Sequence, residues 1–218
     1  MKPFLIDEGT DSHVHYCSAA DFISSGGTLD TSQLATLLEN IVWEEVMGKQ
    51  GQIKRSSAWY VAKPCSCQYK YGGDDWPPND FLPWMEDLCE QVRCVFKYTT
   101  APNAINFNEY KSGSNSLAWH ADDEPLFIDK DGNTTVLSLS VGATRLFQLL
   151  RNGSPESEAK DIELEDGMFM AMSRKMQCFY RHQLPPSRIR GLSGRTRHNL
   201  TFRWIHTHSA TCDVDTDI

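Results

Sequence analysis

Residues 120–123, His-Ala-Asp-Asp, place an imidazole and a carboxylate two positions apart, at His120 and Asp122. In a β-strand, residues i and i+2 point to the same side, so both side chains would reach one point. These two groups supply two of the three ligands of the facial triad that holds Fe(II) and leaves coordination positions open. The His-x-Asp pair also arises by chance in many sequences, so the hypothesis needs a third ligand.

His182 is the strongest candidate for that third ligand. It follows the residues Phe-Tyr-Arg, 179–181, on a predicted strand, and no carboxylate competes with it in this stretch. The alternative is a histidine that is hydrogen-bonded in the core or on the surface, which is the commoner fate of a lone histidine.

A second pattern occupies residues 197–204 and alternates strictly between polar and apolar positions. One predicted face carries Arg197, Asn199, Thr201 and Arg203, and the other carries Leu200, Phe202 and Trp204. Two arginines on one concave face are costly unless an anion pairs with them. A dicarboxylate would satisfy both, because a guanidinium binds a carboxylate through two parallel hydrogen bonds. The alternative is an edge strand whose polar side faces water. Asn108 and Tyr110 repeat the polar geometry on another strand.

The composition predicts one globular domain. The chain has 218 residues, of which 40% are hydrophobic and 23% charged, and its many aromatic residues exclude global disorder. No apolar run is long enough for a membrane-spanning helix, and residues 1–13 resemble neither a secretory signal nor a transit peptide. We therefore expect no membrane partner and a monomer in the nucleus and/or cytoplasm.

Seven cysteines at scattered positions predict reduced thiols rather than a disulfide framework. Cys65-x-Cys67 has one feature of a metal site, but it lacks the second ligand pair that a structural zinc site needs. The residues after Ile205 include His206, His208 and Cys212, which also suggest a metal. A disordered tail over 206–218 is the default expectation.

The net charge of −8 argues against strong nonspecific binding to nucleic acid, but the charges are unevenly distributed. Residues 174–203 hold eight Lys or Arg and no acid, and residues 47–73 hold five and no acid. Such segments indicate either a surface that holds an anionic ligand or two solvated basic loops.

Two helices are predicted before a run of strands. The first begins at Asp30 or Thr31 and places its leucines, Ile41 and Val42 on one stripe. The second begins near Asn79, with Pro83 in its first turn. Between them, residues 54–78 are basic, aromatic and rich in turns, so we expect this segment to cover a site.

Eight short strands are predicted after Val95, at 104–110, 116–122, 135–141, 144–150, 161–164, 168–173, 176–184 and 198–205. Helices followed by strands indicate an α+β fold, and a double-stranded β-helix (jelly roll) with helices packed on one sheet is the expected closure. Residues 1–30 have few periodic apolar positions and predict an extended or partly disordered extension.

Together, these motifs resemble the AlkB family of Fe(II)/2-oxoglutarate dioxygenases, and the eukaryotic alkylation-repair subgroup in particular. The resemblance covers about residues 35–205, including the stretches NEYKSGSNSLAWHADDEPL, ATRLFQL, DGMFMAMSRKMQCFYRHQLP and RHNLTFRW. SSAWY and QYKY resemble the nucleotide-recognition lid of that subgroup. The implied arrangement is a single domain over 31–205, with a lid at about 54–78 and a catalytic jelly roll at about 95–205.

The resemblance implies roles for individual residues. The iron ligands would be His120, Asp122 and His182. The 2-oxoglutarate contacts would be Asn108, Tyr110, Arg197, Asn199 and Arg203, with Arg197 on the distal carboxylate and Arg203 near the C1 carboxylate. The substrate contacts would be Asp123, Tyr69, Tyr71, Trp59 and Arg145, and the alternative for Arg145 is a surface salt bridge.

The implied activity is oxidative removal of N-methyl groups from N1-methyladenine and N3-methylcytosine in DNA or RNA, with O₂ consumed and formaldehyde, succinate and CO₂ released. The target base would come from a single strand or be flipped out of a duplex. Two alternatives stay open. One is a dioxygenase of the same fold that acts on a protein side chain or on a different base modification. The other is a binding module with an impaired metal site, against which the complete set of ligands argues.

Overall fold

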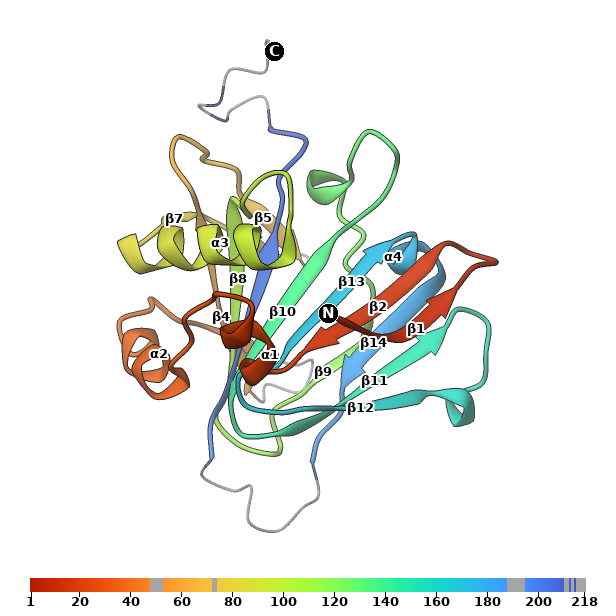
Figure 1. Cartoon of the computed structure of the whole chain (residues 1–218). Coiled ribbons are helices and arrows are strands. Elements are labelled where there is room, and N and C mark those ends of the chain that lie inside the picture. Colours follow the sequence, from red (N-terminus) through yellow and green to blue (C-terminus); the bar gives the residue numbers. More distant parts are fainter. Residues whose placement is uncertain (48–52, 72–73, 188–194, 210–211, 213, 215–218) are drawn as a thin grey trace.

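The computed structural model describes residues 1–47, 53–71, 74–187, 195–209, 212 and 214, and in these residues two mainly antiparallel sheets face each other (Figure 1). The described part of the major sheet has nine strands in the order β1-β2-β13-β10-β15-β8-β4-β3, with β7 parallel to β4. The minor sheet has the order β12-β11-β14-β9, and β5 and β6 form a separate hairpin.

The strands of the major sheet are β1 (Lys2–Asp7), β2 (Ser12–Cys17), β3 (Glu44–Met47), β4 (Ile53–Val61), β7 (Asn79–Asp80), β8 (Ala104–Tyr110), β10 (Val136–Gly142), β13 (Phe169–Arg174) and β15 (Arg197–Arg203). Those of the minor sheet are β9 (Leu117–His120), β11 (Arg145–Arg151), β12 (Lys160–Leu164) and β14 (Tyr180–Leu184). The hairpin consists of β5 (Tyr69–Tyr71) and β6 (Asp74–Trp76). The helices are α1 (Ala19–Ser24), α2 (Thr31–Leu38), α3 (Pro83–Phe96) and α4 (Met176–Phe179), with short 3₁₀ turns at η1 (Pro125–Phe127) and η2 (Glu156–Glu158).

The strands β8 to β15 correspond to the eight predicted strands, and the expected α+β jelly roll is confirmed. The largest difference lies at 176–184, where the helical turn α4 precedes β14. Polar and apolar residues alternate along β8 and β15, so each strand sends one set of side chains outward to the helices and the other inward between the sheets.

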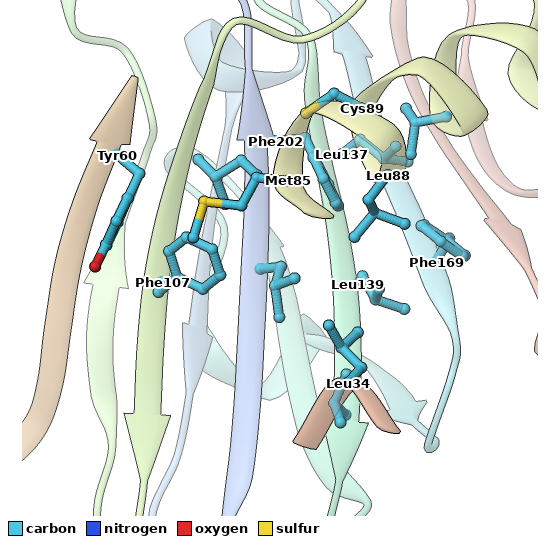
Figure 2. Packing of buried hydrophobic residues seen from close by; sticks show 14 of the residues in the cluster. Leu34, Tyr60, Met85, Leu88, Cys89, Phe107, Leu137, Leu139, Phe169 and Phe202 are labelled. Atoms are coloured by element: carbon cyan, nitrogen blue, oxygen red, sulfur yellow. The ribbon is translucent and has the colours of Figure 1, made fainter. Parts of the chain in front are cut away.

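Helices α2 and α3 cover the outer face of the major sheet (Figure 1). Asp30 is the N-cap of α2: its Oδ1 accepts hydrogen bonds from the backbone N–H groups of Ser32 and Gln33. Helix α3 begins at Pro83, four residues later than predicted, because Asn79 and Asp80 pair with β4 instead. Figure 2 shows the core that these helices make with the sheet, including Leu34, Met85, Leu88, Phe107, Leu139 and Phe202.

The N-terminal residues differ from the expected extension. Strands β1 and β2 form a hairpin, and β2 pairs with β13 from Cys17↔Phe169 to Ser12↔Arg174. Val14 is fully buried there. Of the two expected states, extended or partly disordered, partial disorder was wrong for β1 and β2. Their order comes from strand pairing, of β1 with β2 and of β2 with the distant β13, rather than from a local apolar pattern.

The space between the two sheets is apolar at one end and polar at the other. The apolar end is filled by Phe147, Leu149, Ile162, Met170 and their neighbours. The polar end is open and is lined by side chains of β8, β9, β14 and β15. No helix among the described residues is long and apolar enough to cross a membrane.

Candidate active site

His120, Asp122 and His182 meet at the polar end of the space between the sheets. One ligand atom from each residue lies within 4.8 Å of the others. His120 ends β9 and pairs directly with His182 on β14, and their ring centroids are 4.1 Å apart. The Nε2 atoms of His120 and His182 lie 3.9 and 3.5 Å from the two carboxylate oxygens of Asp122. The predicted pairing of a His-x-Asp motif with a distant histidine is therefore present.

The surroundings orient these three side chains. Nδ1 of His120 lies 2.8 Å from the carbonyl oxygen of Ala118, so a proton on Nδ1 leaves Nε2 free to bind a metal. The backbone N–H of Asp122 donates to Oε1 of the buried Gln177 at 2.9 Å. Burial, followed by the nearby imidazole of His120, lowers the pKa of His182 to about 3 and keeps it neutral, as a metal ligand must be.

Arg203 forms a buried ion pair with Asp122, with Nη2 2.6 Å from Oδ1. Burial opposes ionisation of Asp122, but the Arg203 guanidinium and then the two imidazoles outweigh it and hold the pKa of this carboxyl below its usual range. The carboxylate is therefore charged and fixed in orientation at neutral pH.

Arg197 lies on the same face of β15 as Arg203 and is also buried. Its Nη2 donates to Oγ of Ser140 at 2.9 Å and to Oδ1 of Asn199 at 3.0 Å, and its guanidinium lies 5.4 Å from the ring centre of Tyr110. Burial lowers the pKa of Arg197 to about 10, which leaves it a cation at neutral pH. The Nε atoms of Arg197 and Arg203 are buried and have no hydrogen-bond partner among the described residues.

A single pocket of about 600 Å³, including its open mouth, joins all these groups. Its walls carry the three candidate metal ligands and the five predicted cosubstrate contacts: His120, Asp122, His182, Asn108, Tyr110, Arg197, Asn199 and Arg203. A buried cationic pocket beside two imidazoles and a carboxylate is suited to a metal ion with an organic dicarboxylate bound next to it.

Residues 28–203 match the sequence pattern of the 2OG-Fe(II) oxygenase superfamily. The chain belongs to this superfamily. The expected kinship with the AlkB proteins is also confirmed, because the chain is 30% identical over 186 residues to the mouse (Mus musculus) alpha-ketoglutarate-dependent dioxygenase alkB homolog 3. That match covers 79% of this chain and 60% of the mouse protein.

Another relative is the bovine (Bos taurus) DNA oxidative demethylase ALKBH2, 27% identical over 167 residues, which cover 74% of this chain and 56% of the relative. The chain thus spans about three fifths of the length of these curated relatives. Among solved structures, that of OsALKBH1 superposes with a TM-score of 0.58 at 15% identity, covering 87% of this chain and 97% of that chain. A bsmA homolog from Methylobium petroleophilum PM1 gives 0.56 at 12% identity, covering 90% of both chains, and both likenesses concern the fold.

The site residues fit the cofactors of the 2OG-Fe(II) oxygenases. Two imidazoles and one carboxylate are the donor set that holds Fe(II) with open positions. The unpartnered Nε atoms of Arg197 and Arg203 are buried donors that the two carboxylates of 2-oxoglutarate would satisfy.

Among the predicted substrate contacts, Tyr69 is one that the structure places at the pocket. Its ring is buried, lies 5.6 Å from the Arg203 guanidinium and helps to line the pocket. Its hydroxyl donates to Oε1 of Glu124 at 2.8 Å, and Oε2 of Glu124 lies 3.3 Å from Nη1 of Arg203. Tyr69, Glu124 and Arg203 therefore connect the lid segment to the iron side of the site.

The other predicted substrate contacts lie in different environments. Trp59 does not line the pocket: it is 1% exposed, stacks behind Tyr69 at 5.0 Å, and donates to the carbonyl of Cys67. Asp123 is exposed and follows Asp122 directly, but it is not among the lining residues. The side chain of Tyr71 lies outside the described residues.

Arg145 has a structural role that the sequence did not predict. It is 3% exposed and donates to the carbonyl oxygens of Ser112, Asn115 and Pro185 at 2.7 to 3.3 Å. It is therefore neither a surface salt bridge nor a residue that lines the pocket. Its guanidinium instead joins the 112–115 turn to the residue that follows β14.

Three basic residues of the two acid-free segments, 47–73 and 174–203, lie in different environments. Arg55 is buried in the pocket, and its Nε donates to Oδ1 of Asn108 at 2.7 Å. Lys63 is exposed and pairs with Asp80 at 2.8 Å. Arg195 is exposed, whereas Arg188 and Arg190 lie outside the described residues.

Sequence reasoning missed Arg55, Glu124, Ser138 and Gln177 as parts of the site. Arg55 and Ser138 occupy inward positions of alternating strands, a signal that was present but shared with many strand residues. Glu124 and Gln177 act through tertiary contacts with Arg203 and Asp122, and no spacing in the sequence indicates such pairs.

Proposed function

We propose that this protein is an Fe(II)/2-oxoglutarate-dependent oxidative demethylase that removes N-methyl groups from bases in DNA or RNA. One observation carries the proposal: the triad of His120, Asp122 and His182 shares one pocket with two buried arginines, Arg197 and Arg203. This combination provides a metal face and a dicarboxylate site side by side.

Each residue would have a distinct task. His120, Asp122 and His182 hold the iron, and Arg203 keeps the Asp122 carboxylate ionised and oriented. Arg197, positioned by Ser140 and Asn199, binds the distal carboxylate of 2-oxoglutarate through its remaining donors. When bound, iron with 2-oxoglutarate and O₂ supplies the oxidation of the methyl group, which is then lost as formaldehyde while succinate and CO₂ are released.

The substrate proposal rests on the aromatic side of the pocket, beside Arg203. Tyr69 offers an aromatic surface at the pocket, and stacking on such a ring contributes about 1–3 kcal/mol per base. A base must leave the duplex to reach the iron, and a lesion that already prevents pairing lowers that cost. Asp123 would contact the base edge, and Tyr71 would extend the lid. The name of one relative, a DNA oxidative demethylase, supports a nucleic-acid substrate.

The decisive test is incubation of the protein with Fe(II), 2-oxoglutarate and methylated oligonucleotides. The masses of the bases in the treated oligonucleotides are then measured. N1-methyladenine and N3-methylcytosine in single- and double-stranded DNA and in RNA form the panel, with His182→Ala as the inactive control. The proposal predicts loss of one methylene mass per lesion together with formaldehyde. Oxidation of 2-oxoglutarate with every base mass unchanged would contradict it.

One observation favours a second function, a dioxygenase of the same fold that acts on a protein side chain or a different base modification. Arg55 and Lys63, two cations of the basic segment 47–73, are engaged with Asn108 and Asp80, and the net charge is −8. If oligonucleotides fail to bind even at low salt while 2-oxoglutarate is still consumed, this function replaces the first.

A further inference from the structure

Four potential metal ligands meet in a second place, which shares no residue with the iron triad. Cys65 and Cys67 lie between β4 and β5, and His208 and Cys212 follow β15. One ligand atom from each of the four lies within 4.8 Å of the others, although the two pairs are more than 140 residues apart. In the sequence, Cys65-x-Cys67 lacked a second pair of metal ligands, and the tail was expected to be disordered. The fold brings the two pairs together, so that each supplies the second pair of ligands for the other.

The distances between the ligand atoms match the edges of a tetrahedron. Nδ1 of His208 lies 3.7, 3.6 and 3.3 Å from the sulfur atoms of Cys65, Cys67 and Cys212, and the sulfurs of Cys65 and Cys212 are 3.7 Å apart. A tetrahedral zinc ion with Zn–S of about 2.3 Å and Zn–N of about 2.0 Å requires edges of about 3.5 Å between nitrogen and sulfur and about 3.8 Å between two sulfurs. The four separations given above lie within about 0.2 Å of these edges.

A disulfide does not explain the cluster. All three cysteines are free, and the Sγ atoms of Cys65 and Cys212 are 3.7 Å apart, far beyond the S–S bond length of about 2.0 Å. The cluster therefore contains three thiols and an imidazole, the donor set of Cys₃His zinc sites.

Backbone N–H groups also point at the sulfur atoms. Ser66 donates to Cys212 at 3.3 Å, Ser209 donates to Cys67 at 3.4 Å, and Cys67 donates to Cys65 at 3.5 Å. Two of these three bonds cross between the segments. Hydrogen bonds of this kind stabilise negative charge on sulfur, and thiolates are the form in which cysteine binds a metal.

The surroundings of the cluster are apolar. Cys65 and Cys67 are buried together with Trp59, Phe127 and Ile205, and the Trp59 indole donates to the Cys67 carbonyl. His208 and Cys212 are only half-buried, and the described residues after Arg203, 204–209, 212 and 214, contain no helix or strand. These residues have no ladder of strand or helix hydrogen bonds to hold them. An additional interaction, such as a bound metal ion, would be needed to fix the side chains of His208 and Cys212.

We propose that Cys65, Cys67, His208 and Cys212 form a structural zinc site. All four tetrahedral positions would be taken by protein atoms, so no position would remain open for water or substrate, and the site is therefore structural rather than catalytic. His206, the other histidine of the tail motif, is exposed and stands outside the cluster.

The zinc would join two segments that serve the active site. Cys67 precedes the pocket residue Tyr69 by two positions, and His208 follows Arg203 by five. In Figure 1 the segment entering β5 and the segment leaving β15 lie at the same end of the major sheet. The ion would therefore hold the aromatic wall of the pocket against the strand that carries its two arginines.

The first test is the zinc content of the full chain purified without chelator, measured by plasma mass spectrometry. His182→Ala serves as the background, because it disables the iron triad as a competing zinc site. In this background we expect about one zinc per chain. Adding Cys67→Ser or His208→Ala to the background should remove that zinc. The matched controls Cys178→Ser and His206→Ala change exposed side chains and should keep the zinc. Zinc-free protein, or equal zinc in ligand and control variants, overturns the proposal.

Two measurements need no ligand variant and so hold even if such variants fail to fold. Co(II) added to the chelated chain should give thiolate-to-cobalt charge-transfer bands, which the triad cannot produce because it contains no sulfur. In the untreated protein, Cys94 and Cys178 should be alkylated, while Cys65, Cys67 and Cys212 should react only after zinc is removed. Absence of the bands, immediate alkylation of Cys212, or a Cys65–Cys212 disulfide in the native protein overturns the proposal.

Zinc removal should also destabilise the fold, because metal-binding free energy contributes directly to folding. We expect the Tm to fall by roughly 5–10 °C on chelation and to recover with Zn²⁺ but not with Mg²⁺. An unchanged Tm in protein that has demonstrably lost its zinc would overturn the structural role.

Discussion

Arg203 and Asp122 are joined by a buried ion pair of 2.6 Å between Nη2 and Oδ1, and neither side chain is more than 7% exposed. This pair links the cosubstrate strand β15 directly to the metal face. Removing one member of a buried pair leaves the other as an uncompensated charge. The pair therefore contributes to both the stability and the function of the site.

Arg203→Ala should lower the free energy of unfolding of the metal-free protein by about 3–5 kcal/mol, measured by urea denaturation. Arg93→Ala is the control: its ion pair with Glu90 lies on the exposed face of α3, and its loss should cost about 0–1 kcal/mol. Equal costs for the two substitutions would show that the Arg203–Asp122 pair does not stabilise the pocket.

Arg197→Lys should raise the KM for 2-oxoglutarate by roughly 10- to 100-fold, because an ammonium group cannot reproduce the two-bond fork of a guanidinium. Succinate formation at varied 2-oxoglutarate measures the effect. At saturating cosubstrate the rate should return to within a few-fold of the wild type. A wild-type KM would mean that Arg197 binds something other than the cosubstrate.

Tyr69→Ala should lower demethylation of a methylated oligonucleotide by roughly 10- to 100-fold, in keeping with the loss of one stacking partner. Tyr69→Phe keeps the ring and loses only the hydrogen bond to Glu124, so it should retain more activity. The salt dependence of oligonucleotide binding should stay unchanged in both variants, since it reports phosphate contacts. Equal loss in both variants would assign the effect to the hydroxyl instead of the ring.

His198 predicts a pH dependence of stability away from the metal site. It lies 3.5 Å from Glu109 and stacks on Trp43, and burial lowers its pKa below 6.5. Below about pH 6.5 the unfolded chain therefore binds a proton that the folded protein does not, and stability falls as the pH falls. His198→Gln should reduce that slope by at most about 1.4 kcal/mol per pH unit, measured by urea denaturation between pH 7 and 5. The exposed control His206→Gln should keep the wild-type slope. If the slope of His198→Gln equals that of the wild type or of this control, the assignment is contradicted.

The sequence predicted β8 and β15 well because polar and apolar residues alternate along both strands. The same alternation placed Arg197, Asn199 and Arg203 on one face, and the structure shows them in one pocket. The N-terminal hairpin was missed because β2 is ordered by pairing with β13, more than 150 residues away in the sequence.

Features that depend on tertiary contacts could not be predicted. Arg145 received a substrate role from its position in the family pattern, but three backbone carbonyls bind its guanidinium. Glu124 carries no motif, and only the fold brings it to Tyr69 and Arg203. The Cys65–Cys67 pair was similarly incomplete until the fold placed His208 and Cys212 beside it.

The central claim is that His120, Asp122 and His182 hold the iron that drives 2-oxoglutarate oxidation. The most direct measurement is succinate formation from 2-oxoglutarate by purified protein with and without Fe(II), in the wild type and in His120→Ala, Asp122→Ala and His182→Ala. We predict turnover only with Fe(II) in the wild type, none in the three variants, and normal turnover in the exposed control His206→Ala. Wild-type turnover in any one of the three variants would contradict the account, because that residue would then not be a ligand of the catalytic iron.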